Sequence, residues 1–217
     1  MSQVKERPIL FSGPMVRAIL EGQKTVTRRP IKPSMRGFDV SFELHQQDDG
    51  SWRPMHTFDE SCMDDQGTEH PIACPYGGPG DRLWVRESLG YDCEYGHYFA
   101  AGGKHGETVY LCSLFDDEDA QTGPSYDGLL PERSVPSIHL HRRYSRILLE
   151  ITAVRVERLQ EITPSQCIAE GAWRIEDKAI GRGHEAVAAF KDLWQSTGGD
   201  WDANPWVWVV EFRRVQP

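Results

Sequence analysis

The chain has 217 residues, a formal net charge of −9 at pH 7, 39% hydrophobic residues and seven Trp. This composition suits one folded domain carrying insertions and excludes a wholly disordered chain. No run of 18 apolar residues is present, so we expect no membrane span, and the first 13 residues do not resemble a secretory signal. The five Cys, an odd number, predict free thiols in the reducing cytoplasm.

The net charge is unevenly distributed. Residues 1–36 carry +6, residues 37–135 carry −15, and residues 136–217 are neutral. The basic first segment can attract an anionic or nucleotide-like ligand despite the overall sign. The twenty carboxylates of the middle segment disfavour a long polyanion wherever they face the ligand.

The first predicted elements are a strand at 8–11 and a helix that begins at Pro14 and ends at Gly22. Residues 23–32 form a segment rich in β-branched and basic residues. A long irregular stretch is expected to follow at 33–80. Within that stretch, the turn signal Asp49-Gly50 predicts a hairpin.

In the next part of the chain, residues 81–88 alternate as a strand with Leu83 and Val85 inward. Residues 90–137 are expected to form a second irregular excursion. Residues 146–159 give the longest strand signal, and its apolar phase slips near Ala153, which predicts a bulge or bend.

The last predicted elements are a capped helix that begins at Thr163 and ends near Glu170, an amphipathic helix at 184–197, and a central strand at 206–215. We expect Trp194 and Trp208 to belong to the core. Phosphate-loop and dinucleotide-binding glycine patterns are absent. The order therefore favours an α+β fold, a small mixed barrel with flanking helices.

Lys24 and Thr27 are the most distinctive chemical pair. A lysine amine becomes a general base for a hydroxyl when burial or nearby cations favour its neutral form, and Arg17, Arg28 and Arg29 are close in sequence. In a flat strand the two side chains would point to opposite faces, so they meet only if the chain curls. The alternative is a basic strand edge that discourages aggregation.

Glu170 is the second chemical candidate. It ends a short helix, where the helix dipole disfavours negative charge, so its carboxyl group is a candidate proton carrier. The alternative is an ordinary surface glutamate.

Together these stretches resemble the ASCH domain, a PUA-like barrel. The similarity lies in four stretches at roughly 8–32, 79–88, 145–171 and 184–215, and it leaves insertions at about 37–78 and 90–140 in a single domain spanning 1–217. Its motif residues are Gly22, Lys24, Thr25, Thr27, Arg29, Gly80, Asp81, Leu83, Ala169, Glu170, Gly171, Val209 and Phe212. The stretch around Pro79–Glu87 also looks like phage or prophage members.

This resemblance implies hydrolysis of the amide of N4-acetylcytidine or related N4-acylated cytosine nucleosides, without cofactor or metal. Thr27 would attack the acyl carbonyl, Lys24 would take its proton, and Glu170 would protonate the leaving nitrogen. The expected substrate-binding residues are Arg28, Arg29, Trp84, Arg86 and Glu87. Arg28 departs from the family pattern, which has an apolar residue at this position.

Other interpretations remain open. The chain is alternatively an RNA-binding or RNA-cleaving ASCH module, or a non-enzymatic phage-type protein that contacts its partner through the acidic middle segment. The basic residues His139, His141, Arg142, Arg143 and Arg146 form a candidate phosphate contact or a solvated turn. Cys62, His70 and Cys74 match no common zinc spacing, so the metal question there stays open. The oligomeric state is not indicated.

Overall fold

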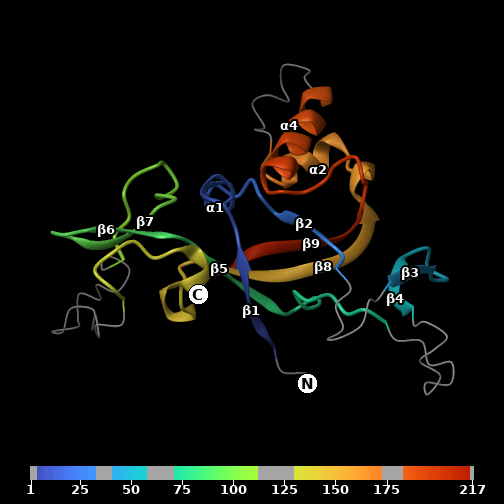
Figure 1. Ribbon diagram of the computed structural model, residues 1–217, viewed down its shortest axis with the longest axis horizontal. Helices are drawn as coiled ribbons and strands as arrows, with labels where there is room; N and C mark the ends of the chain where they lie inside the picture. Colours follow the sequence, from blue (N-terminus) through green and yellow to red (C-terminus); the bar gives the residue numbers. More distant parts are fainter. Residues whose placement is uncertain (1–3, 33–40, 58–70, 112–129, 173–182, 216–217) are drawn as a thin grey trace. The chain divides into compact units, whose positions relative to one another are not determined.

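The computed structural model describes residues 4–32, 41–57, 71–111, 130–172 and 183–215 (Figure 1). Its main sheet has five strands in the order β1-β5-β8-β9-β2. They are β1 (Glu6–Leu10), β2 (Val26–Pro30), β5 (Arg82–Arg86), β8 (Leu148–Arg158) and β9 (Trp206–Val215). β1 pairs with β5 in parallel, whereas β5–β8 and β2–β9 are antiparallel. The expected mixed α+β class is confirmed.

Smaller elements complete the described chain. Two hairpins form separate two-stranded sheets: β3 (Ser41–Gln46) with β4 (Trp52–Thr57), and β6 (Leu89–Asp92) with β7 (Gly96–Phe99). The helices are α1 (Gly13–Leu20), α2 (Pro164–Ala169), α4 (Gly183–Ser196) and the short 3₁₀ turns η2 (Ser137–His139), η3 (Arg142–Tyr144) and η4 (Leu159–Glu161).

The expected barrel is not closed among the residues that the structure describes. In the strand order, β1 and β2 are the outer members, and neither has a second strand partner in the described part of the chain. None of the described helices has the length and apolar character that crossing a membrane requires.

The chain divides into two compact units, each built from separate segments. The first unit comprises residues 1–25, 80–151 and 212–217, and the second comprises residues 26–79 and 152–211. The boundary between the two units within β8 falls after Ile151, close to the predicted phase slip at Ala153. Leu148, Leu149 and Ile151 are buried before it, and Val156 is the buried residue after it.

In the first unit, β5 is buried on both faces because it lies between β1 and β8. Leu83 and Val85 are inaccessible to solvent, as the alternation predicts. The second expected excursion is partly regular, because residues 90–92 and 96–99 lie in strands; residues 112–129 lie outside the described residues. β6 and β7 pack on a core of their own, formed by Leu89, Phe99, Leu111, Leu130, Val135, Leu140 and Tyr144. Strands of four residues are too short to give a clear periodic signal, which is why the pattern missed them.

In the second unit, α2 and α4 cover one face of β2 and β9 (Figure 1). The predicted capping box at the start of α2 is confirmed. The Thr163 backbone N–H donates to the Gln166 side chain at 2.8 Å, and the Gln166 N–H donates to the Thr163 hydroxyl at 3.4 Å. Trp194 and Trp208 are both buried, as expected of core residues. The predicted hairpin turns at Asp49-Gly50, where Gly50 has a φ of 79° that suits glycine.

Candidate functional site

Strand β2 carries three of the predicted site residues, and pairing with β9 fixes their directions. Thr27 lies opposite Val210, Arg28 opposite Val209, and Arg29 opposite Trp208. Because side chains alternate along a strand, Thr27 and Arg29 share one face of the sheet and Arg28 is directed to the other. Thr27 and Arg28 are both buried.

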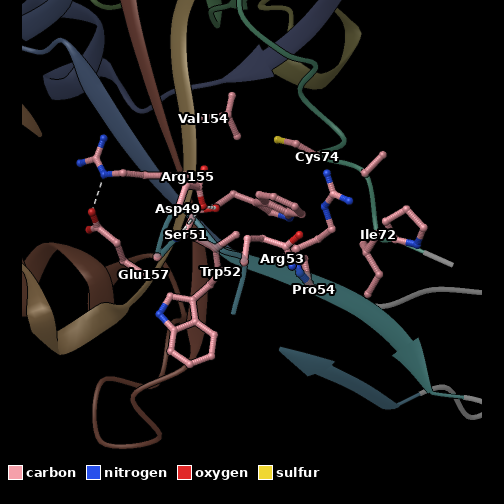
Figure 2. Close-up of a pocket in the computed structure, with 16 residues that line it drawn as sticks. Asp49, Ser51, Trp52, Arg53, Pro54, Ile72, Cys74, Val154, Arg155 and Glu157 are labelled. Atoms are coloured by element: carbon pink, nitrogen blue, oxygen red, sulfur yellow. Dashed lines mark hydrogen bonds and ion pairs between the residues drawn. The ribbon is translucent and has the colours of Figure 1, made fainter. Parts of the chain in front are cut away.

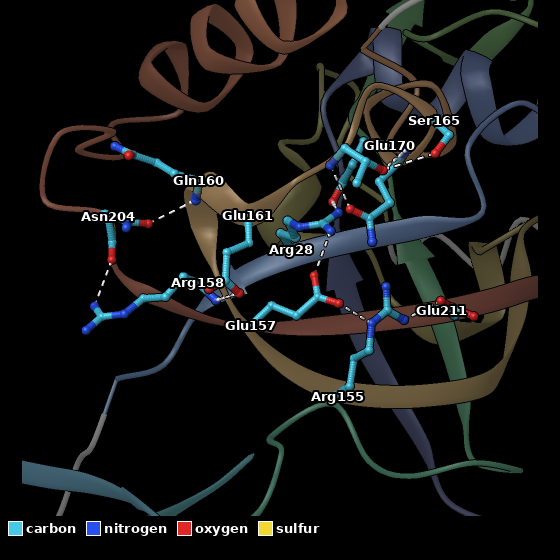
Figure 3. Close-up of polar contacts among 12 residues, drawn as sticks. Arg28, Arg155, Glu157, Arg158, Gln160, Glu161, Ser165, Glu170, Asn204 and Glu211 are labelled. Atoms are coloured by element: carbon cyan, nitrogen blue, oxygen red, sulfur yellow. Dashed lines mark hydrogen bonds and ion pairs between the residues drawn. The ribbon is translucent and has the colours of Figure 1, made fainter. Parts of the chain in front are cut away.

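Arg28 is held between two carboxylates from different elements of the second unit (Figure 3). One terminal nitrogen, Nη1, donates to Glu170 Oε1 at 3.2 Å, and the other, Nη2, donates to Glu157 Oε2 at 2.9 Å. The Arg28 side chain is 0% exposed and that of Glu170 is 3% exposed. Burying a charge is costly unless it is paired, so these contacts explain how a buried arginine is tolerated here.

Glu170 takes its position from the end of α2. It is the C-cap residue, and its backbone N–H donates to the carbonyl oxygen of Gln166 at 2.9 Å. The following Gly171 has a φ of 74°, a left-handed conformation that ends the helix. The helix end therefore directs a buried carboxylate toward the guanidinium of Arg28, so Glu170 is not the surface glutamate of the alternative interpretation.

Lys24 belongs to the first unit, in the connection between α1 and β2. Because β2 begins only at Val26, the alternation of a flat strand does not apply to Lys24. Gly22, with a φ of 79°, turns the chain after α1, and the Lys24 backbone N–H then donates to the Ala18 oxygen at 3.0 Å. The side chain is buried, with Nζ 5.4 Å from the centre of the Phe11 ring.

Trp84, Arg86 and Glu87 also lie in the first unit. Trp84 is buried, and the Arg86 guanidinium lies 4.8 Å from the centre of its ring. Both Glu87 oxygens accept from Arg146, at 3.0 and 2.7 Å, and Arg146 additionally donates to the carbonyl oxygen of Gly102. Arg146 is thus a buried ion-pair partner rather than an exposed phosphate contact.

A cavity of about 690 Å³ lies within the second unit (Figure 2). The hairpin β3–β4 and residues 71–74 contribute one side, including Pro54 and Ile72, and β8 contributes the other, including Arg155 and Glu157. Trp208 of β9 also lines it. Neither Thr27 nor Glu170 lines the cavity, but Trp208 lies opposite Arg29 and is therefore a diagonal neighbour of Thr27 on the same face of the sheet.

The charges that line this cavity cancel. They are two carboxylates, Asp49 and Glu157, and two guanidinium groups, Arg53 and Arg155. Hydrogen bonds from Ser51 hold the pKa of Asp49 below its usual value, so Asp49 is ionised at neutral pH. The neutral balance suits an uncharged ligand better than a phosphate chain.

Sequence reasoning did not find Glu157 and Arg155. Both lie on β8, where they alternate with Val154 and Val156. The available signal was two charged residues at a spacing of two between valines, since one side of this part of the strand must then meet charged partners. Arg28, the partner of Glu157, is 129 residues away in the chain, which no local pattern reveals.

The three residues for which the sequence left metal binding open are only partly covered by the structure. Cys74 is described, whereas Cys62 and His70 lie outside the described residues. Among the residues that are described, no three His, Cys, Asp or Glu side chains are grouped so that they could hold a metal ion. The acidic run at 116–120 also lies outside the described residues.

Comparison with known proteins gives no match: no family model, no curated protein and no solved structure is similar to this chain.

Proposed function

We propose that the chain is an amidohydrolase that removes the acyl group from N4-acetylcytidine or a related N4-acylated cytosine nucleoside, on a PUA-like fold of the ASCH type. One observation carries the proposal. Among the described residues, seven polar or charged ones are buried, and four of them belong to the predicted constellation or directly adjoin it: Lys24, Thr27, Arg28 and Glu170. Burial of charged groups is costly and rare away from functional sites or tight ion pairs.

The proposed reaction has two stages. In the first, the Thr27 hydroxyl oxygen attacks the acyl carbonyl while its proton passes to the amine of Lys24, which precedes it by three residues in the chain. The C–N bond then breaks as Glu170, which has taken up a proton on substrate binding, gives that proton to the leaving N4; this releases cytidine and leaves an acyl ester on Thr27.

In the second stage, water hydrolyses the ester. Glu170, now ionised, takes a proton from the attacking water, and the Thr27 oxygen recovers its proton from Lys24 as the carboxylic acid departs. An internal threonine lacks an N-terminal amine as its base, so the scheme requires the lysine.

The cavity of the second unit is not lined by Lys24, Thr27 or Glu170, but its size and charge suit a neutral ligand. Its volume of about 690 Å³ lies within the usual range for small-molecule sites, and Trp208 lies in its wall. Its charges cancel, which favours a nucleoside over RNA as the ligand.

The test is incubation of the purified full-length protein with N4-acetylcytidine, followed by ultraviolet absorbance as cytidine appears. We expect turnover that changes little between low and high salt, because the substrate is uncharged. Absence of turnover together with RNA binding that weakens steeply with salt would instead favour the RNA-directed alternative.

A further inference from the structure

Five charged side chains of the second unit form a continuous chain of ion pairs (Figure 3). In order they are Glu170, Arg28, Glu157, Arg155 and Glu211. The exposed fraction of the three carboxylate side chains rises along this series: 3% for Glu170, 21% for Glu157 and 43% for Glu211. This series of ion pairs therefore leads from the buried end of α2 to the surface.

Arg28 is the only member of this chain with no exposed side-chain surface, and its orientation is set from both ends. Nη1 donates to Glu170 and Nη2 to Glu157, so the planar guanidinium is fixed between α2 and β8. With Glu157 removed, the guanidinium could rotate about its remaining contact, and the carboxyl group of Glu170 would lose a fixed partner.

We propose that Glu157 is a positioning residue, which acts through Arg28 to hold the Glu170 carboxyl group in place at the end of α2. The proposal rests on the proposed function, in which Glu170 carries the proton. Glu157 also lines the cavity, so the ion-pair chain connects the cavity wall with Glu170.

The first test is Glu157→Gln, which keeps the shape of the side chain and removes its charge. We expect kcat for N4-acetylcytidine to fall by about 10- to 100-fold, the effect of a small misplacement of a reacting group, with KM within about twofold. The matched control is Glu211→Gln, the same change at the exposed end of the chain, where the partner is Arg155 rather than Arg28. Its kcat should stay within about twofold of wild type. Equal losses in both variants would overturn the proposal.

The second test asks whether Glu157 acts through Arg28. In the background of Arg28→Met, or of Arg28→Lys should the methionine variant not fold, Glu157→Gln should have no further effect on kcat. An undiminished effect in that background would overturn the proposal. The amplitude of a pre-steady-state burst of cytidine counts active molecules, so partial unfolding would lower the amplitude, whereas mispositioning lowers the rate constant.

A third measurement separates failure of this inference from failure of the proposed function. The ¹³C-carboxyl resonance of Glu170, assigned with Glu170→Gln, should shift in Glu157→Gln and not in Glu211→Gln, whether or not the protein hydrolyses acylcytidines. An active wild-type protein with an unmoved Glu170 resonance in Glu157→Gln would overturn the positioning role alone. An inactive wild-type protein with a shifted resonance would overturn the proposed amidohydrolase function and support the positioning of Glu170 by Glu157.

Discussion

Thr27, Lys24 and Glu170 are the residues on which the proposed chemistry depends. We expect Thr27→Ala to abolish cytidine release, because it removes the nucleophilic oxygen. Lys24→Ala and Glu170→Ala should each lower kcat by about 10²- to 10⁴-fold, the usual contribution of a general acid or base. Thr27→Ser, which keeps a hydroxyl, should retain measurable turnover.

The measurement is kcat for N4-acetylcytidine, with circular dichroism to show that each variant is folded. If all three alanine variants kept the wild-type rate, the mechanism would be wrong. The structure adds a reason for the folding control, since all three side chains are buried.

Cys167 is a buried thiol on α2 near the ion pair. Its pKa is raised to about 11 from the usual 9.0, mainly because the thiol is buried; Arg28 lowers the pKa and Glu170 raises it by smaller amounts. At pH 8 only about one Cys167 in a thousand would then be the reactive thiolate. We expect iodoacetamide at pH 8 to label exposed Cys93 quickly and Cys167 only after denaturation.

Peptide mapping by mass spectrometry measures this difference in labelling. The raised pKa of Cys167 also makes the stability of the fold depend on pH. Because the folded thiol holds its proton up to a higher pH than the unfolded thiol, its contribution to stability is complete below pH 9 and is lost as the pH rises toward 11. Rapid labelling of Cys167 in the native protein would show that the thiol is accessible after all.

At the scale of the elements, the backbone of Gly199, just after α4, lies very close to the Trp194 ring. The helix packs Phe190 and Trp194 into the core of the second unit. A Cβ atom at Gly199 would lie only 2.3 Å from Trp194 Nε1, so the buried indole ring would have to move. We expect Gly199→Ala to destabilise the protein by about 1–3 kcal/mol, as overpacking does.

Chemical denaturation gives the free energy of unfolding for this comparison. Gln195→Ala, on the exposed side of the same helix, is the control and should change that energy by no more than about 0.5 kcal/mol. A neutral Gly199→Ala would mean that Trp194 moves aside at little cost.

Most of the described elements could be predicted from sequence because their signals are local. The Thr163 capping box, the Asp49-Gly50 turn and the apolar run of β9 each depend on a few adjacent residues. The hairpin β6–β7 could not be predicted, because its core is assembled from residues between Leu89 and Tyr144. For the site, the sequence supplied Thr27 and Glu170 as candidates but not their surroundings.

At the scale of the whole molecule, the two compact units are interleaved along the chain. The chain passes from one to the other at four places, and both β8 and β9 contain residues of each unit. Because β8 and β9 each contribute residues to both units, one unit cannot lose these strands without affecting the other. We therefore expect a single cooperative unfolding transition.

Thermal unfolding followed by far-ultraviolet circular dichroism and by Trp fluorescence checks this expectation. The seven Trp include Trp84 in the first unit and Trp194, Trp201 and Trp208 in the second. Coincident midpoints are expected, and two separated transitions would show that the units unfold independently.

The sequence by itself determined the local elements, the uneven charge and the candidate residues Lys24, Thr27 and Glu170, since caps, periodicity and composition act over short distances. Only the tertiary structure decided what surrounds them. Arg28 donates hydrogen bonds to Glu157 and Glu170, which are 129 and 142 residues away in the chain. The cavity is lined by the β3–β4 hairpin and by β8. A buried charge selects its partner through space, so the reason for an arginine at position 28 appears only once the strands and the helix end are in place.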